Sequence, residues 1–183
     1  KELGIEVLPA SVLHSRRKFT AKDGKIRFGL LAIKNVGTGI VDAIVEGRQG
    51  CNIDNLYDFI KSIDPSELNK KAVECLIKAG AMDEFTPNRA ALLAISDDAV
   101  RAAQSSARKL SKDQISLFQL DSDLMEDVKT APELPDIQNF DMAHLLAMEK
   151  EMMGVYLSGH PLDKYRELIG KNITANTGEI FDS

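Results

Sequence analysis

The 183 residues are enough for one ordinary domain or for two or three small modules. Aromatic residues make up 5% of the chain and Trp is absent, which suits a small helical core better than a β-sandwich. No apolar run approaches the ~18–20 residues of a membrane span and no signal peptide is visible, so we expect no membrane partner. The cysteines Cys51 and Cys75 lack metal or CxxC spacing, which favours a reduced, cytoplasmic setting with both side chains buried.

Charge is distributed unevenly along the chain, whose formal net charge is −5. Residues 1–110 hold 17 Lys and Arg against 14 Asp and Glu, whereas residues 111–183 hold 6 against 14. A mildly basic part followed by an acidic part indicates two roles. Neither part is basic enough to bind nucleic acid by charge alone.

A small β-hairpin is expected near the start of the chain. Asp23-Gly24 separates two short runs, residues 18–22 and 25–28, and Asp-Gly between two such runs is a strong hairpin signal. Residues 1–7 have no helix cap and resemble the end of an interrupted element.

The stretch 28–48 predicts two helices joined by a tight turn. An apolar run at 30–33 leads into the turn at 34–39, and a second apolar run follows. Asn and Gly at positions 35, 37 and 39 tolerate positive φ or close backbone approach. A helix start at such a turn presents backbone N–H groups that attract anions, and we expect the anion to be a nucleic-acid phosphate.

An ordinary helix corner without a ligand explains the turn at 34–39 equally well on spacing alone. Lys34, Thr38 and Arg48 are candidates for additional phosphate contacts. For Arg48, a solvated surface role is the better interpretation.

A second unit of the same kind follows, and it is degenerate. Residues 55–63 place apolar side chains on one helical face, and Asp64-Pro65-Ser66 then breaks the helix and suits a new helix start. The next amphipathic helix runs from Glu67 to a turn at Ala79, Gly80 and Ala81. Two helix–hairpin–helix units can hold successive phosphates of one duplex, by contacts that carry no sequence information.

The longest helix is expected to open at Pro87-Asn88 and to keep its periodicity to about Leu110. Its expected apolar face holds Leu92, Ile95, Ala99, Ala102, Ala103, Ala107 and Leu110. Its expected polar-face cations are Arg89, Arg101, Arg108 and Lys109.

Residues 111–139 form an acidic stretch without helical periodicity, which is long for a loop and therefore expected to be exposed. Gln114, Leu117 and Phe118 fit a short linear peptide that docks on a partner, with Leu117 and Phe118 as apolar anchors. The alternative is a loop whose apolar residues fold back onto the core.

The last part of the chain predicts a helix over 140–153, a compact turn, a short helix over 162–169 and a polar linker. Ala143, Leu146, Ala147 and Met153 share one face of the first of these helices. His160 in the compact turn is a lone histidine without a nearby Cys, His or carboxylate triad, which favours a structural role over a catalytic one. The 183 residues show no catalytic constellation and no metal-binding set.

Five segments occur in the order seen in bacterial DNA polymerase III alpha subunits, and the chain resembles that family from residue 4 to about 166. They are FGLLAIKNVG (28–37), LNKKAVECLIKAGAMD (68–83), NRAALL (88–93), QISLF (114–118) and YLSGHPLDKY (156–165). Asn35 stands where the family often has Gly, and Asn tolerates the left-handed region, so the turn should survive. Ile115 replaces the usual Leu.

The resemblance implies a mainly α fold: a tandem helix–hairpin–helix domain with a small N-terminal β-hairpin and a long irregular loop. It divides the chain into the end of the fingers domain (1–28), the DNA-binding region with the long helix (29–110), the clamp-binding loop (111–139), a helix and SGHPL segment that packs back (140–170), and a linker toward an OB-fold domain (171–183).

The resemblance also implies site residues and partners. Double-stranded DNA would be bound by Lys34, Asn35, Val36, Gly37, Thr38, Gly39, Ala79, Gly80 and Ala81. The sliding clamp, or beta subunit, would be bound by Gln114, Ser116, Leu117 and Phe118. Other holoenzyme subunits would be further partners.

The full-length parent would be a DNA-directed DNA polymerase, a nucleotidyltransferase with Mg²⁺ in its palm domain. The palm carboxylates are absent here, so this chain is expected to be inactive by itself and to hold no cofactor. The competing interpretation is a helix–hairpin–helix module of a repair protein that is not a polymerase. A third interpretation makes the turns packing corners only.

Overall fold

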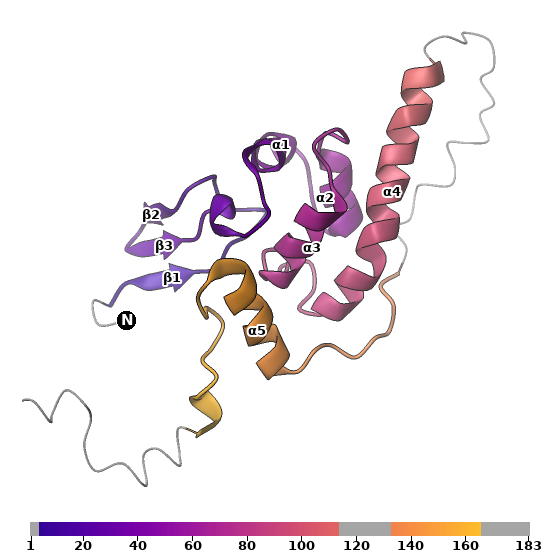
Figure 1. The fold of residues 1–183 in the computed structure, drawn as a ribbon. Coiled ribbons are helices and arrows are strands. Elements are labelled where there is room, and N and C mark those ends of the chain that lie inside the picture. The colour runs from indigo at the N-terminus through magenta and orange to yellow at the C-terminus, as the bar shows by residue number, and fades with distance from the viewer. Residues whose placement is uncertain (1–3, 114–132, 166–183) are drawn as a thin grey trace, which may run out of the picture.

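The computed structural model describes residues 4–113 and 133–165, which form a mainly α fold with a small sheet at one side (Figure 1). From the sheet, the helices α1 (Thr38–Gly47), α2 (Leu56–Ser62), α3 (Lys70–Lys78) and α4 (Arg89–Asp113) follow across the molecule. Helix α5 (Met142–Met153) returns to lie against α3, to the lower right of the sheet in this view (Figure 1). None of the helices in these described ranges is long and apolar enough to cross a membrane.

The predicted β-hairpin is confirmed. Strands β2 (Thr20–Lys22) and β3 (Lys25–Arg27) pair antiparallel, and the turn between them places Asp23 at φ 52° and Gly24 at φ 73°. Two consecutive positive φ values match the right-handed strand twist, which explains the Asp-Gly pair. A third strand, β1 (Glu6–Leu8), pairs parallel with β3, so the sheet order is β1-β3-β2. The sequence pattern did not predict β1.

The prediction of two helices over 28–48 is wrong for the first of them. Leu30–Ala32 forms only a single 3-10 turn, η1, because the chain bends back at Ile33, whose backbone is extended. Helix α1 (Thr38–Gly47) is the one full helix of this stretch. Its apolar side chains Ile40, Val41 and Ile44 are buried.

Helix α2 (Leu56–Ser62) agrees with the predicted span, and its start is fixed by the Asn55 side chain, which accepts hydrogen bonds from the N–H groups of Tyr57 and Asp58. Helix α3 (Lys70–Lys78) begins later than predicted. Residues 65–67 instead form a turn, and the Asn69 side chain accepts from the N–H of Ala72 at the true start.

Helix α4 (Arg89–Asp113) ends three residues later than predicted. It packs on α2 and α3 through Leu92, Ala99 and Val100. Two assignments to its faces are wrong: Ala102 is exposed and Arg89 is buried. The helical periodicity predicted Arg89 on the exposed face. Arg89 is buried instead, because Asp83 and Glu149 neutralise its charge inside the protein.

Helix α5 (Met142–Met153) buries Leu146, Met148 and Met152. The predicted face is wrong in part, because Ala143 and Ala147 are exposed. The helix predicted over 162–169 is a single 3-10 turn, η3 (Asp163–Tyr165), as far as the structure describes it.

One helical core joins the N-terminal segment to all the helices. Its largest fully buried side chains include Phe59, Leu30, Ile44, Leu76, Met82 and Leu92. Cys75 lies in this core, whereas Cys51 is exposed, so the prediction that both cysteines are buried is half wrong. Cys51 stands in the loop between α1 and α2.

Candidate nucleic-acid interface

The turn between η1 and α1 is held from two sides. Asn35 adopts φ 61°, and its side-chain amide lies 3.6 Å from the sulfur of buried Cys75. The N–H of Lys34 donates to the carbonyl of Met152 at the end of α5, at 2.9 Å. The expectation that Asn at position 35 preserves the turn is therefore confirmed.

The two glycines of this turn, Gly37 and Gly39, differ in the space around them. Gly37 lies at φ −83° and ψ 174°, a conformation that any residue adopts, and a Cβ there would meet nothing within 4 Å. A Cβ on Gly39 would meet the carboxylate at the end of the exposed Glu67 side chain, which would have to move aside. Positive φ is required at Asn35 only.

The first turn of α1 is open. Gly37 is its N-cap residue and supplies no side-chain oxygen, and Gly37 and Thr38 are exposed. Within the described residues, no acceptor is bonded to the N–H groups of Thr38, Gly39 or Ile40. These N–H groups and the positive end of the helix dipole favour an anion.

The other described α-helices have side-chain caps. Asn55, Asn69 and Asp141 accept hydrogen bonds from the first N–H groups of α2, α3 and α5. At the start of α4, Asn88 accepts from the N–H of Ala91 at 3.1 Å. Their leading N–H groups are thus partly occupied within the chain, whereas those of α1 are available to a ligand.

A groove of about 500 Å³ along the flank of α1 is acidic. Asp42, Glu46, Asp64 and Glu67 contribute four carboxylates to its lining. Asp42 is neutralised by an ion pair with Arg17. Glu67 is the carboxylate that lies against Gly39, so it acts against an anion at the start of α1.

The second predicted turn, Ala79 to Ala81, is a helix C-terminus. The N–H groups of Ala79, Gly80 and Ala81 donate to carbonyls of Cys75, Ile77 and Leu76 at 2.9–3.0 Å. All three residues are buried. The expectation that this turn presents free N–H groups is wrong, because α3 uses them to end itself. Contact of these residues with DNA stays a prediction.

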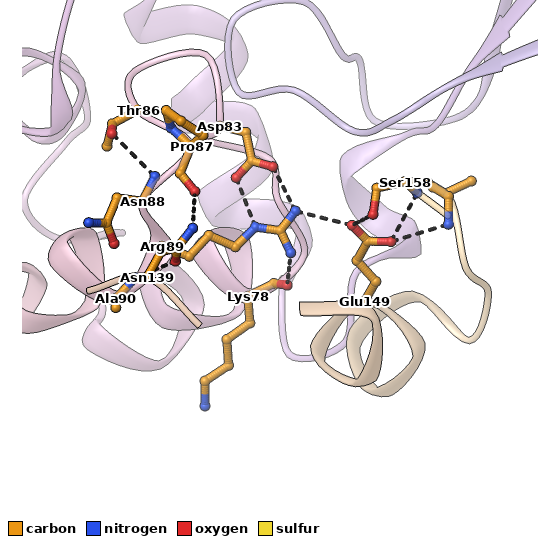
Figure 2. Close-up of polar contacts among 11 residues, drawn as sticks. Lys78, Asp83, Thr86, Pro87, Asn88, Arg89, Ala90, Asn139, Glu149 and Ser158 are labelled. Carbon is orange, nitrogen blue, oxygen red and sulfur yellow. Dashed lines mark hydrogen bonds and ion pairs between the residues drawn. The ribbon is translucent and has the colours of Figure 1, made fainter. Parts of the chain in front are cut away.

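Arg89 lies against Gly80 of this turn, and Figure 2 shows its guanidinium between Asp83, the carbonyl of Lys78 and Glu149. Its guanidinium donates to Asp83 at 2.6 and 2.9 Å, to the carbonyl of Lys78 at 3.2 Å and to Glu149 at 3.1 Å. Gly80 has φ 77°, and a Cβ on it would overlap the guanidinium. Arg89 thus joins the end of α3, the start of α4 and helix α5.

Glu149 extends the same network to the SGHPL segment (Figure 2). It accepts hydrogen bonds from the hydroxyl of Ser158 at 2.7 Å and from the N–H groups of Leu157 and Ser158, both at 3.2 Å. Glu149 and Arg89 are 2% and 4% exposed, so this is a buried charge network with its polar groups satisfied.

Both charges of the network are stabilised. Burial alone raises the pKa of Glu149, but hydrogen bonds from Ser158, Arg89 and Leu157 outweigh it, and the net pKa is lowered. Burial likewise lowers the pKa of Arg89, while its bonds with Asp83 and Glu149 raise it by more. Both groups remain charged at neutral pH.

His160 has a local role in this region. Its Nδ1 accepts from the N–H of Leu162 at 3.2 Å, and its ring meets Tyr156 edge-on at a centroid distance of 5.6 Å. These contacts agree with the structural interpretation of His160. Among the described residues, no group of three or more His, Cys, Asp or Glu side chains could hold a metal ion.

The structure brings together one part of the predicted site. Lys34, Asn35, Gly37 and Thr38 are exposed at the start of α1, while Val36 is buried. Gln114, Ser116, Leu117 and Phe118 lie outside the described residues. No local sequence pattern connects Glu67 or Met152 to this turn, because both approach it from distant parts of the chain.

Comparison with known proteins identifies the segment. A family of proteins described by the helix-hairpin-helix motif matches residues 4–92. The chain is 39% identical to DNA polymerase III subunit alpha of Bacillus subtilis over 91% of its own length. The identity to the same subunit is 37% for Vibrio cholerae over 98% of the chain and 34% for Mycobacterium tuberculosis over 100%.

These relatives are much longer than the chain, which spans 14–16% of their length. The similarity extends past residue 92, beyond the helix-hairpin-helix match. The chain therefore belongs to the DNA polymerase III alpha subunits, as one segment of such a subunit that includes its helix-hairpin-helix motif.

Proposed function

We propose that this segment serves a bacterial replicative DNA polymerase by holding duplex DNA through its backbone and by binding the sliding clamp. The parent subunit would be a DNA-directed DNA polymerase, with its Mg²⁺-dependent chemistry in a palm domain outside these residues. The relatives are DNA polymerase III alpha subunits, which supports the polymerase assignment. Attachment to the clamp would make re-binding of the polymerase to the primer end intramolecular. This would raise the effective concentration of the primer end at the polymerase.

The open first turn of α1 carries the DNA-binding part of this proposal. Its N–H groups lack a side-chain cap, Lys34 and Asn35 stand exposed beside it, and no acidic residue lies in the first turn. One phosphate fits this arrangement without any contact to a base, so binding should be independent of sequence. The small number of cations predicts weak binding that decreases with salt.

A repair module is the competing function. The relatives are similar to the chain over 91–100% of its length, including the part after the helix-hairpin-helix match, and they carry the polymerase name. This extent favours the polymerase segment over a generic helix–hairpin–helix module.

The DNA test uses the 183-residue chain and a fluorescently labelled duplex at low salt. Gly37→Asp supplies the missing cap and a negative charge at the start of α1. We expect duplex affinity to fall by roughly tenfold, while thermal stability stays equal or rises, because Asp caps helices at least as well as Gly. Gln138→Glu is the matched control, since it adds the same charge at an exposed position away from the turn.

Two results would contradict the assignment of duplex binding to the start of α1. Equal duplex affinity of Gly37→Asp and Gln138→Glu would show that the start of α1 is not the contact. A strong preference of the wild-type chain for one duplex sequence would contradict binding through phosphates.

The clamp test replaces Leu117 and Phe118 by Ala and titrates the chain against a purified bacterial sliding clamp. We expect loss of binding with unchanged circular dichroism, because the two apolar anchors would supply most of the affinity. Leu120→Ala with Leu124→Ala is the matched control, as it removes two apolar side chains from the same stretch outside the motif. Unchanged affinity of the Leu117 and Phe118 variant would end the clamp assignment.

A further inference from the structure

A basic cleft lies between the β-hairpin and the far end of α1. It has a volume of about 620 Å³, and four of its lining residues are cations. Arg16, Arg17 and Lys18 come from the segment that leads into β2, and Arg48 comes from the end of α1. Since α1 has 10 residues, the cleft is about 15 Å from the open first turn at its other end.

The charge of this cleft is largely uncompensated. Arg17 is paired with Asp42. Among the described residues, Arg16, Lys18 and Arg48 have no carboxylate within 4.0 Å. Arg48 is held in place by a 2.8 Å hydrogen bond from its Nη1 to the carbonyl of Val12.

Arg16 and Arg48 are close enough to repel each other. Burial, and next the charge of Arg16, lower the pKa of Arg48. An anion between the two guanidinium groups would relieve this repulsion and replace the lost hydration. Guanidinium groups bind phosphate oxygens in a forked geometry, so a phosphodiester suits the cleft.

An exposed aromatic ring borders the cations. Phe19 lines the cleft and is 53% exposed. Its ring rests on Phe28, with centroids 4.6 Å apart, and Phe28 packs against the core. The ring of Phe19 is therefore held in position with much of its surface open to solvent, which suits stacking with a nucleobase.

We propose that this cleft binds single-stranded DNA, with phosphates on Arg16, Lys18 and Arg48 and a base stacked on Phe19. A groove of cations with an aromatic platform is the combination that holds unpaired strands, because the bases of a duplex are not free to stack on a side chain. An acidic peptide would match the cations but would leave the ring of Phe19 without a partner. This site goes beyond the proposed duplex and clamp contacts and does not depend on them.

The test measures binding of a labelled oligothymidine to the 183-residue chain at low salt. The double variant Arg16→Glu with Lys18→Glu should weaken binding by roughly tenfold or more, because charge reversal removes two phosphate contacts. The double variant Lys61→Glu with Lys71→Glu makes the same charge change at exposed positions on α2 and α3 and should have a much smaller effect. Thermal unfolding verifies that each variant is folded.

A second variant separates stacking from charge. Phe19→Leu keeps an apolar side chain and should weaken oligothymidine binding by roughly fivefold or more, since it removes the ring on which a base would stack. Duplex binding should not change with Phe19→Leu. Gly37→Asp should change oligothymidine binding no more than Gln138→Glu does, so failure of either site is distinguishable from failure of the other.

Three outcomes would overturn the proposal. The first is an equal effect of the cleft and control charge reversals on oligothymidine binding. The second is unchanged oligothymidine affinity of a folded Phe19→Leu variant. The third is displacement of the oligonucleotide by oligoglutamate as effectively as by unlabelled oligothymidine, which would assign the cleft to an acidic peptide.

Discussion

Glu67 brings a negative charge to the start of α1, which among the described α-helices is the start without a side-chain cap. Its carboxylate lies against Gly39 in the first turn of α1. A carboxylate there satisfies part of the helix dipole and competes with an incoming phosphate. Glu67 accepts no hydrogen bond from the N–H groups of this turn, so they stay available, but its negative charge limits how tightly DNA would be held.

Glu67→Gln should therefore tighten duplex binding by roughly two- to fivefold at low salt, the equivalent of 0.3–1 kcal/mol for one charge at a helix end. Fluorescence anisotropy of a labelled duplex measures the change. Glu46→Gln is the control, because Glu46 lines the same groove from the other end of α1. If Glu67→Gln and Glu46→Gln have equal effects, the gain reflects net charge and not the position of Glu67.

Gly80 combines two constraints at one residue. Its φ of 77° disfavours any side chain, and the Arg89 guanidinium occupies the space where a Cβ would lie. Gly50 has nearly the same φ, 74°, with nothing within 4 Å of a Cβ. The two glycines thus share the backbone cost of substitution and differ in packing.

Gly80→Ala should lower the free energy of unfolding by about 2–4 kcal/mol, whereas Gly50→Ala should lower it by about 1 kcal/mol, because only the first displaces a buried charged group. Urea denaturation followed by circular dichroism measures both. Equal losses would mean that Arg89 moves aside without cost.

At the scale of elements, α5 is attached to the rest of the protein by a charge network as well as by apolar packing. Leu146, Met148 and Met152 bury its apolar side, and Glu149 reaches Arg89 and the Ser158 segment from the same helix. The carbonyl of Met152 then accepts from the N–H of Lys34 at the DNA-binding candidate turn. Helix α5 therefore helps to hold the turn before α1 in place.

Glu149→Gln should lower the free energy of unfolding by about 3 kcal/mol, because it removes one charge from a buried, hydrogen-bonded pair. Glu151→Gln is the matched control on the same helix, where the side chain is exposed, and should change stability by less than about 0.5 kcal/mol. Urea denaturation of both variants provides the comparison. A loss for Glu149→Gln no larger than that of the control would show that the network adds nothing to α5.

At the scale of the whole molecule, the network predicts how stability depends on pH. The folded pKa of Glu149 lies below its usual value of 4.5. A carboxyl with a lowered folded pKa contributes stability that is fully present above the usual value and is lost as the pH falls through the folded pKa.

The wild-type chain should therefore lose stability as the pH is lowered below about 4.5, and Glu149→Gln should lose less over the same window. Unfolding free energies from urea titrations at a series of acidic pH values test this expectation. Parallel pH profiles for wild type and Glu149→Gln would assign the acid sensitivity to other carboxylates. Glu151→Gln should follow the wild-type profile.

Local signals in the sequence determined much of the fold. Asp23-Gly24 encodes the hairpin turn through two positive φ values, and Asn55 marks the start of α2 through its side-chain cap. The tolerance of Asn35 for the left-handed region preserved the turn before α1. Each of these features depends on residues within a few positions, so no tertiary contact was needed to predict them.

Tertiary structure decided the remainder, because it depends on residues far apart in the chain. Arg89 is of a residue type that is usually exposed. It is buried here because its guanidinium donates hydrogen bonds to Asp83, to the carbonyl of Lys78 and to Glu149. The turn at 79–81 has the sequence of a hairpin, but its N–H groups donate to carbonyls of α3 and its residues are buried in the core. The start of α1 remains open because its own sequence supplies no cap, yet only the fold places the Glu67 carboxylate against it.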